Sequence, residues 1–140
     1  MVSVWVIQWV IKINNISLLN KIIKRIKKKG IVALDTETNS LNIEIAELVG
    51  ISIAFDEKQA FYIPINHKNI ENNKKLKEQL SEKEVLELIK IICLDPSILK
   101  IGQNLKYDIR ILKKYDVKFN SIDDTMLLSY AIDNGLTRHG

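Results

Sequence analysis

The spacing of apolar residues along the chain predicts three amphipathic helices. In three segments apolar residues recur every three to four positions, and the positions between them are polar. Ser17 and Ser81 are expected as the N-caps of the first two helices, with Glu84 completing a capping box in the second. Gly30 suits the C-cap of the first helix. The predicted helices are Ile16–Gly30, Ser81–Cys93 and Gln103–Tyr115.

Short apolar runs before and between these helices predict the strands of a sheet. The polar turn Asp56–Lys58 joins two of the runs, so these two are expected to pair as an antiparallel hairpin. The polar stretch His67–Gln79 is expected to be a loop. A short strand and then a helix, with Asp124 as its N-cap, are expected near the C-terminus. The other predicted strands are Ile31–Glu37, Leu48–Phe55, Gln59–Ile65 and Ile98–Gly102.

The order of these elements predicts an α/β fold. An antiparallel meander comes first and helix-connected strands follow, which indicates a mixed sheet with helices packed on it. The near-continuous apolar run of Ile31–Glu37 favours a central position for this strand, because central strands are buried on both faces. Residues 1–15, which include "MVSVWVIQWVIKI", are interpreted as a leader or an edge strand, and residues 16–140 as the domain.

Composition narrows the class of protein only moderately. The 140 residues contain 21 Lys and Arg and 17 Asp and Glu. The excess of positive charge fits nucleic-acid attraction, and it fits codon bias equally well, because Ile, Lys and Asn are all abundant. The single cysteine, Cys93, excludes an internal disulfide framework and is expected in the core. His67 and His139 lie too far apart to suggest a zinc site.

No segment of the sequence predicts membrane association. The apolar N-terminal run is too short to span a bilayer, and it lacks the basic residues and the cleavage site of a signal peptide. A cytoplasmic location is therefore expected.

A pair of carboxylates marks the end of the predicted central strand. Asp35 and Glu37 are two residues apart, so on a strand they point to the same face. Two adjacent carboxylates repel each other, and a hard divalent cation such as Mg²⁺ or Mn²⁺ relieves the repulsion. Asn104 and Asp108 are four residues apart and are expected on one face of the third helix. Another face is expected in the core, through Leu105, Ile109 and Leu112.

The pair alone fits a helix cap or a solvated strand end as well. Several motifs in order resolve this choice: "VALDTETNSLN", "ELVGISIAF", "YIPI", "KIGQNLKYDIRIL" and "DDTMLLSY". Over roughly residues 31–140 they resemble the 3′-5′ proofreading exonuclease domain of bacterial family A DNA polymerases, in the DEDD (DnaQ-like) superfamily. The resemblance implies a ribonuclease-H-like fold, of which this chain would hold the first two-thirds.

The resemblance also implies the chemistry of the site. Asp35, Glu37 and Asp108 would be catalytic and would hold two divalent metal ions, Mg²⁺ or Mn²⁺, with the second site incomplete. The expected substrate is the 3′ end of single-stranded DNA, and the expected partner is the rest of a polymerase. From the residues alone, Leu41 and Tyr107 would be interpreted as core residues. The expected substrate-binding residues are Thr38, Leu41, Gln103, Asn104 and Tyr107.

The third motif of this family, Tyr-x-x-x-Asp, does not occur in the 140 residues, where Tyr107, Tyr115 and Tyr130 are followed four positions later by Ile, Phe and Asn. Three hypotheses stay open: an exonuclease whose last motif is supplied by residues not in this sequence, a non-catalytic module that binds single strands or a partner, and a remnant of a split polymerase gene. The isolated chain is expected to be nearly inactive.

Overall fold

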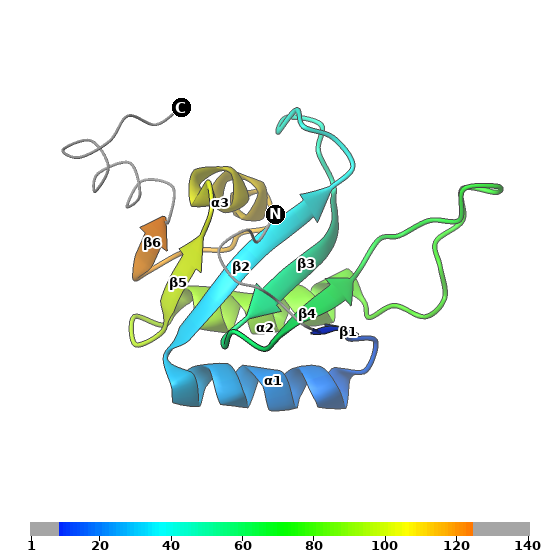
Figure 1. The fold of residues 1–140 in the computed structure, drawn as a ribbon. Helices are drawn as coiled ribbons and strands as arrows, with labels where there is room; N and C mark the ends of the chain where they lie inside the picture. Colours follow the sequence, from blue (N-terminus) through cyan, green and yellow to red (C-terminus); the bar gives the residue numbers. More distant parts are fainter. Residues whose placement is uncertain (1–8, 125–140) are drawn as a thin grey trace.

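The structure is a computed structural model, and the residues that it describes are 9–124. Within these residues a mixed sheet of six strands has the order β1-β4-β3-β2-β5-β6 (Figure 1). β2 lies inside the sheet, antiparallel to β3 and parallel to β5, as its apolar run predicts. β3 and β4 form the predicted antiparallel hairpin. The strands are β1 (Trp9–Lys12), β2 (Ile31–Thr38), β3 (Leu48–Ala54), β4 (Gln59–Pro64), β5 (Leu99–Gly102) and β6 (Ile122–Asp124).

Three helices occupy the predicted segments. They are α1 (Ile16–Lys29), α2 (Glu82–Leu94) and α3 (Leu105–Lys113). Gly30 ends α1 with φ 76°, a left-handed conformation that glycine adopts without strain, and Ser81 caps α2 by accepting from the Glu84 N–H at 3.2 Å. The prediction of Ser17 as the first N-cap is wrong. Asn15 is the cap, because its Oδ1 accepts from the N–H groups of Ser17 and Leu18.

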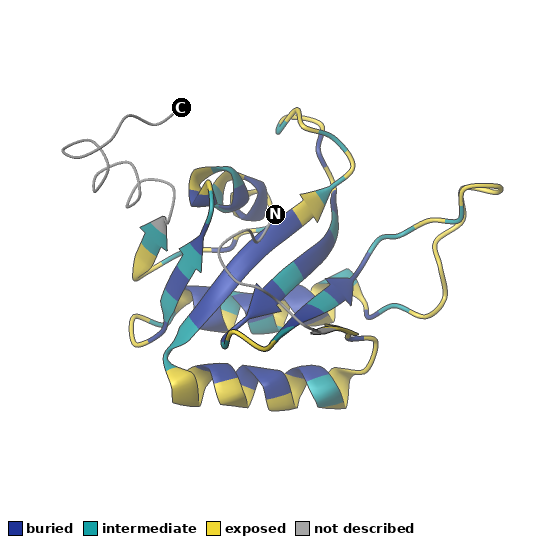
Figure 2. Cartoon of the chain, viewed as in Figure 1, coloured by how far each residue is buried: buried dark blue, intermediate teal, exposed yellow. Residues whose placement is uncertain are grey.

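The helices and one face of the sheet share the main hydrophobic core. The buried sides of α1, α2 and α3 pack on alternate residues of β2, β3 and β4, as the dark inner surfaces in Figure 2 show. The core includes Cys93, which is fully buried as predicted, and burial raises the pKa of its thiol to about 12. In α3, Leu105 and Leu112 are buried as expected, whereas Ile109 is only half-buried and Ile111 takes a buried position instead.

The opposite face of the sheet carries small side chains. Ala33, Ala54 and Ala60 form a second, separate cluster with Ile101. Because strand residues alternate between faces, this is also the face of Asp35 and Glu37 on β2. The arrangement confirms the α/β class and places both carboxylates on the side of the sheet away from the main core.

The two ends of the described segment extend the sheet. Trp9–Lys12 is an edge strand that pairs in parallel with β4. The division of the chain at residue 15 stays a prediction. β6 is the short strand expected near the C-terminus, while the helix that Asp124 is expected to cap lies outside the described residues. Between residues 9 and 124, no helix has both the length and the apolar character needed to cross a bilayer.

Candidate active site

The C-terminal half of β2 places two carboxylates on one face of the sheet. Asp35 is 8% exposed and lies opposite Ser52 of β3, whereas Glu37 is exposed and lies opposite Gly50. The two facing residues are small, so their own side chains do not cover the carboxylates. The register of β2 and β3 shifts between Glu37 and Thr38, at the end of β2. Asp35 is therefore the anchored acid and Glu37 the accessible one.

Asp108 comes from α3 and is fixed against β2 by a residue that sequence reasoning missed. Its Oδ1 accepts hydrogen bonds from the Thr36 backbone N–H at 2.8 Å and from the Thr36 hydroxyl at 2.5 Å. The side chain is 2% exposed. These two bonds fix the orientation of the carboxylate and join α3 to the central strand.

Burial raises the pKa of Asp108 to about 6. The hydrogen bonds from Thr36 act in the opposite direction, and the charge of Asp35 raises the pKa further. Asp35 and Asp108 are therefore close enough to interact, although they are 73 positions apart in the sequence. Among residues 9–124, no three or more His, Cys, Asp or Glu side chains are arranged to hold a metal ion. The assignment of Glu37 to a shared site with these two acids stays a prediction.

Two predicted substrate-binding residues meet at the same edge of the sheet. The Thr38 and Tyr107 hydroxyls lie 2.8 Å apart, and both are within hydrogen-bonding distance of the Ser40 carbonyl oxygen. Leu41, in the loop after β2, is 93% exposed, so the core role that its residue type suggests is excluded. Tyr107 is half-buried and packs against the main core. An apolar side chain thus projects from a loop that is tied to α3.

The two amide residues stand just before α3 (Leu105–Lys113). Gln103 is half-buried, and Asn104 is the exposed N-cap with φ 57°. The prediction that Asn104 and Asp108 share one helix face is wrong, because Asn104 precedes the helix. Asn104 is exposed, whereas Asp108 is buried. Both residues lie near the carboxyl end of β5, beside β2.

A further residue outside the predictions fixes the loop of residues 39–47. The Lys114 ammonium group donates to the Ile43 carbonyl oxygen at 2.9 Å and to the Ala46 carbonyl oxygen at 2.5 Å. Asn39 and Glu47 close the base of the loop, since the Glu47 N–H donates to Asn39 Oδ1 at 2.8 Å. The loop that carries Leu41 is therefore held at its base and by α3.

Lys114→Met is expected to loosen this loop while leaving the fold intact. The substitution removes two charge-assisted hydrogen bonds and keeps most of the aliphatic stem. Amide hydrogen exchange of residues 39–47 should become roughly fivefold to tenfold faster. Lys113→Met is the matched control, because its lysine is exposed and adjacent. Equal exchange rates in wild type and Lys114→Met would contradict the anchoring role.

The matching family model is described as a 3′-5′ exonuclease and covers residues 10–140. The chain belongs to this 3′-5′ exonuclease family of bacterial DNA polymerase I. It is 37% identical over 143 residues to DNA polymerase I of Rhizobium leguminosarum, covering 93% of this chain and 14% of the relative. The chain thus spans about one seventh of the length of that relative.

Solved structures share the fold of this exonuclease domain at low identity. The Trypanosoma brucei RNase D: GMP complex has a TM-score of 0.70 and 15% identity, covering 89% of this chain and 36% of that one. The EXD2 exonuclease domain soaked in Mg and GMP has a TM-score of 0.58 and 16% identity, covering 91% of this chain and 61% of that one. The ribonuclease-H-like DEDD fold predicted from the sequence is confirmed.

A tyrosine on β4 borders the carboxylate face of the exonuclease domain. Tyr62 lies over Gly50, since a Cβ atom at Gly50 would be 2.0 Å from the Tyr62 hydroxyl oxygen. The hydroxyl is 2.6 Å from Nε2 of His67. Burial, and after it the charge of Glu37, raises the pKa of Tyr62. Glu37, Gly50 and Tyr62 therefore lie side by side on three adjacent strands.

Gly50→Ala is expected to destabilise the domain by about 1–3 kcal/mol, because the new methyl group displaces the Tyr62 ring. Urea unfolding of the single variant and of the same substitution in a Tyr62→Ala background measures the effect. In that background the cost should fall, because the obstructing ring is absent. A cost of equal size in both backgrounds would show that Tyr62 does not set the requirement for glycine.

Proposed function

We propose that this chain hydrolyses the 3′-terminal nucleotides of single-stranded DNA, and that Asp35, Glu37 and Asp108 hold the two divalent metal ions, Mg²⁺ or Mn²⁺, that the reaction needs. The observation that carries the proposal is the buried Asp108 carboxylate, fixed to β2 by Thr36 and within electrostatic reach of Asp35. In a chain of the 3′-5′ exonuclease family, such a pair is expected to serve the reaction.

The residues fit a hard divalent cation in their chemistry. All three are carboxylates, and Mg²⁺ and Mn²⁺ prefer oxygen ligands. The raised pKa of Asp108 reports an unfavourable buried charge beside Asp35, which a cation would offset. Among structures with this fold, the EXD2 exonuclease domain was soaked in Mg with GMP and in Mn with dGMP. When bound, such ions activate a water and stabilise the leaving 3′ oxygen.

The chain's own residues would bind and orient the strand. Leu41 offers an apolar side chain to the terminal base, and the Tyr107 ring offers a contact that tolerates any base. Thr38, bonded within the same cluster, fixes the start of this loop relative to α3. Gln103 and Asn104 carry amides that can bond to the sugar and phosphate of the strand. Such contacts would bind a single strand without selecting its base sequence.

We expect slow catalysis from the 140-residue chain as it stands. It carries the three acids proposed for the site, and the family's Tyr-x-x-x-Asp motif does not occur in its 140 residues. When several groups act together on one transition state, the loss of one of them can lower the reaction rate by several orders of magnitude. The chain covers 14% of a DNA polymerase I relative, so the rest of a polymerase is the proposed partner. The proposed location is the cytoplasm.

Nucleotide release from a 5′-labelled single-stranded oligonucleotide tests the proposal. With protein in excess and Mg²⁺ or Mn²⁺ present, the expected result is a slow ladder of products that shortens from the 3′ end, with nucleoside 5′-monophosphates released. A duplex of the same sequence should be cut more slowly. Shortening from the 5′ end, internal cuts, or binding of the strand without any release would contradict the proposal.

A further inference from the structure

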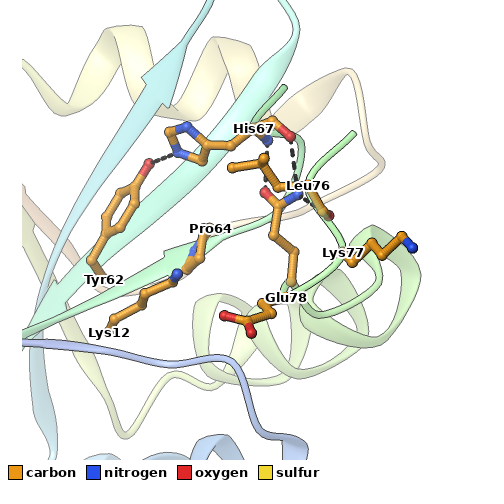
Figure 3. A pocket seen from close by; sticks show the side chains of 8 residues that line it. Lys12, Tyr62, Pro64, His67, Leu76, Lys77 and Glu78 are labelled. Atoms are coloured by element: carbon orange, nitrogen blue, oxygen red, sulfur yellow. Dashed lines mark hydrogen bonds between the residues drawn. The ribbon is translucent and has the colours of Figure 1, made fainter. Parts of the chain in front are cut away.

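A pocket opens on the carboxylate face of the sheet, beyond Tyr62. Its volume is about 370 Å³, within the range of small-molecule sites. β1 and β4 provide one wall through Lys12, Tyr62 and Pro64, and the loop before α2 provides the other through Leu76 and Glu78 (Figure 3). An aromatic ring and two apolar side chains thus line a space that also has charged groups.

Hydrogen bonds hold the loop wall in place. The Gln79 side chain accepts from the His67 backbone N–H at 2.7 Å and donates to the carbonyl oxygens of His67 at 3.0 Å and Leu76 at 2.7 Å. The Leu76 N–H also donates to the His67 carbonyl oxygen at 2.9 Å. In Figure 3 the His67 ring points to the Tyr62 hydroxyl, which joins the two walls. The pocket is therefore built before any ligand binds.

The strand register connects this pocket to the candidate active site. Lys12 pairs with Tyr62, Tyr62 with Ser52, and Ser52 with Asp35, so the four residues form one row across β1, β4, β3 and β2. Side chains of such a row lie on one face of the sheet. A ligand leaving the acids of β2 along this face reaches Tyr62 and then the pocket.

We propose that this pocket binds a nucleoside 5′-monophosphate, the product that the proposed reaction releases; the choice of ligand rests on that proposed function. The Tyr62 ring and Pro64 would contact the base, and the Lys12 ammonium group, which lies beside Pro64 in Figure 3, would pair with the phosphate. Glu78 favours a single nucleotide over a longer strand. Its carboxylate can accept from a sugar hydroxyl, and it would repel a second phosphate.

Binding of dAMP to the full 140-residue chain in EDTA, measured by calorimetry, tests this site. EDTA removes the metal ions, so the acids of β2 cannot contribute a metal-bound nucleotide. Wild type is expected to bind dAMP more tightly than it binds deoxyadenosine, inorganic phosphate or the dinucleotide pdApdA. Lys12→Ala and Tyr62→Leu should each weaken binding roughly tenfold. Lys58→Ala, an exposed lysine at the other end of β4, and Asp35→Ala should leave it unchanged, and thermal melting verifies folding of each variant.

Several results would overturn the assignment. They are no dAMP binding at millimolar concentration, binding that Asp35→Ala abolishes, equal affinity for inorganic phosphate, or affinity untouched in folded Lys12→Ala and Tyr62→Leu. The assay involves no catalysis, so failure of this proposal can be told apart from failure of the proposed function. An active exonuclease without this binding would refute the pocket alone, and a chain that binds dAMP without hydrolysing DNA would refute the proposed function alone.

Discussion

Asp35→Ala is expected to lower the rate of 3′-nucleotide release by roughly 10³-fold or more. Asp35 is the buried acid of the central strand, and its charge acts directly on Asp108. Its loss would remove one of the three carboxylates that are proposed to hold the metal ions. Single-turnover release from a 3′-labelled oligonucleotide with Mn²⁺ measures the change.

The control for this prediction is Glu57→Ala, which removes an exposed carboxylate from the β3–β4 turn. It should leave the rate within about twofold of wild type, since surface substitutions away from the site act weakly. A rate in Asp35→Ala equal to that in Glu57→Ala would place the catalytic centre elsewhere.

Asp108→Asn is expected to abolish activity and yet stabilise the metal-free protein at pH 8. The amide oxygen can still accept both hydrogen bonds from Thr36, while the buried negative charge disappears. In the folded wild type the pKa of Asp108 is about 6, against an ordinary value of 3.8. This difference corresponds to roughly 2–3 kcal/mol of lost stability when the group is ionised. Urea unfolding in EDTA measures the gain.

The gain in stability from Asp108→Asn is expected to depend on pH, because folding raises the pKa of Asp108. A carboxyl group whose pKa is raised by folding costs stability above its folded pKa, and the cost disappears as the pH falls from about 6 toward 4. The advantage of Asp108→Asn should therefore be complete at pH 8 and small at pH 4. A variant less stable than wild type at pH 8 would show that the carboxylate is favourably accommodated in the metal-free protein.

The sequence alone predicted the sheet well because its strands are apolar runs with clear turns between them. Ile31–Glu37 reads as a buried strand, and it lies inside the sheet. The helix caps were harder. Asn15 and Ser17 are both residues that cap helices, and their spacing does not decide which side chain reaches the free N–H groups. Asn104 takes a left-handed conformation that its residue type allows but does not require.

Within the site, the two-residue spacing on β2 predicted the pair Asp35 and Glu37, and the family resemblance predicted Asp108. The contacts that hold them depend on residues far apart in the chain. Thr36 meets Asp108 over 72 positions, and Lys114 meets Ala46 over 68. Tyr62 borders the site because β4 lies beside β3 and Gly50 has no side chain. No periodicity within one element indicates such contacts.

Binding of Mn²⁺ to wild type and to Asp35→Ala, measured by calorimetric titration, tests the central claim most directly. Three carboxylates from β2 and α3 are proposed to hold the ion, so the account predicts weak binding in wild type. Asp35→Ala should lose this binding, and Lys12→Ala should retain it. Mn²⁺ binding that is unchanged in Asp35→Ala would contradict the account, because the metal would then be held by other residues.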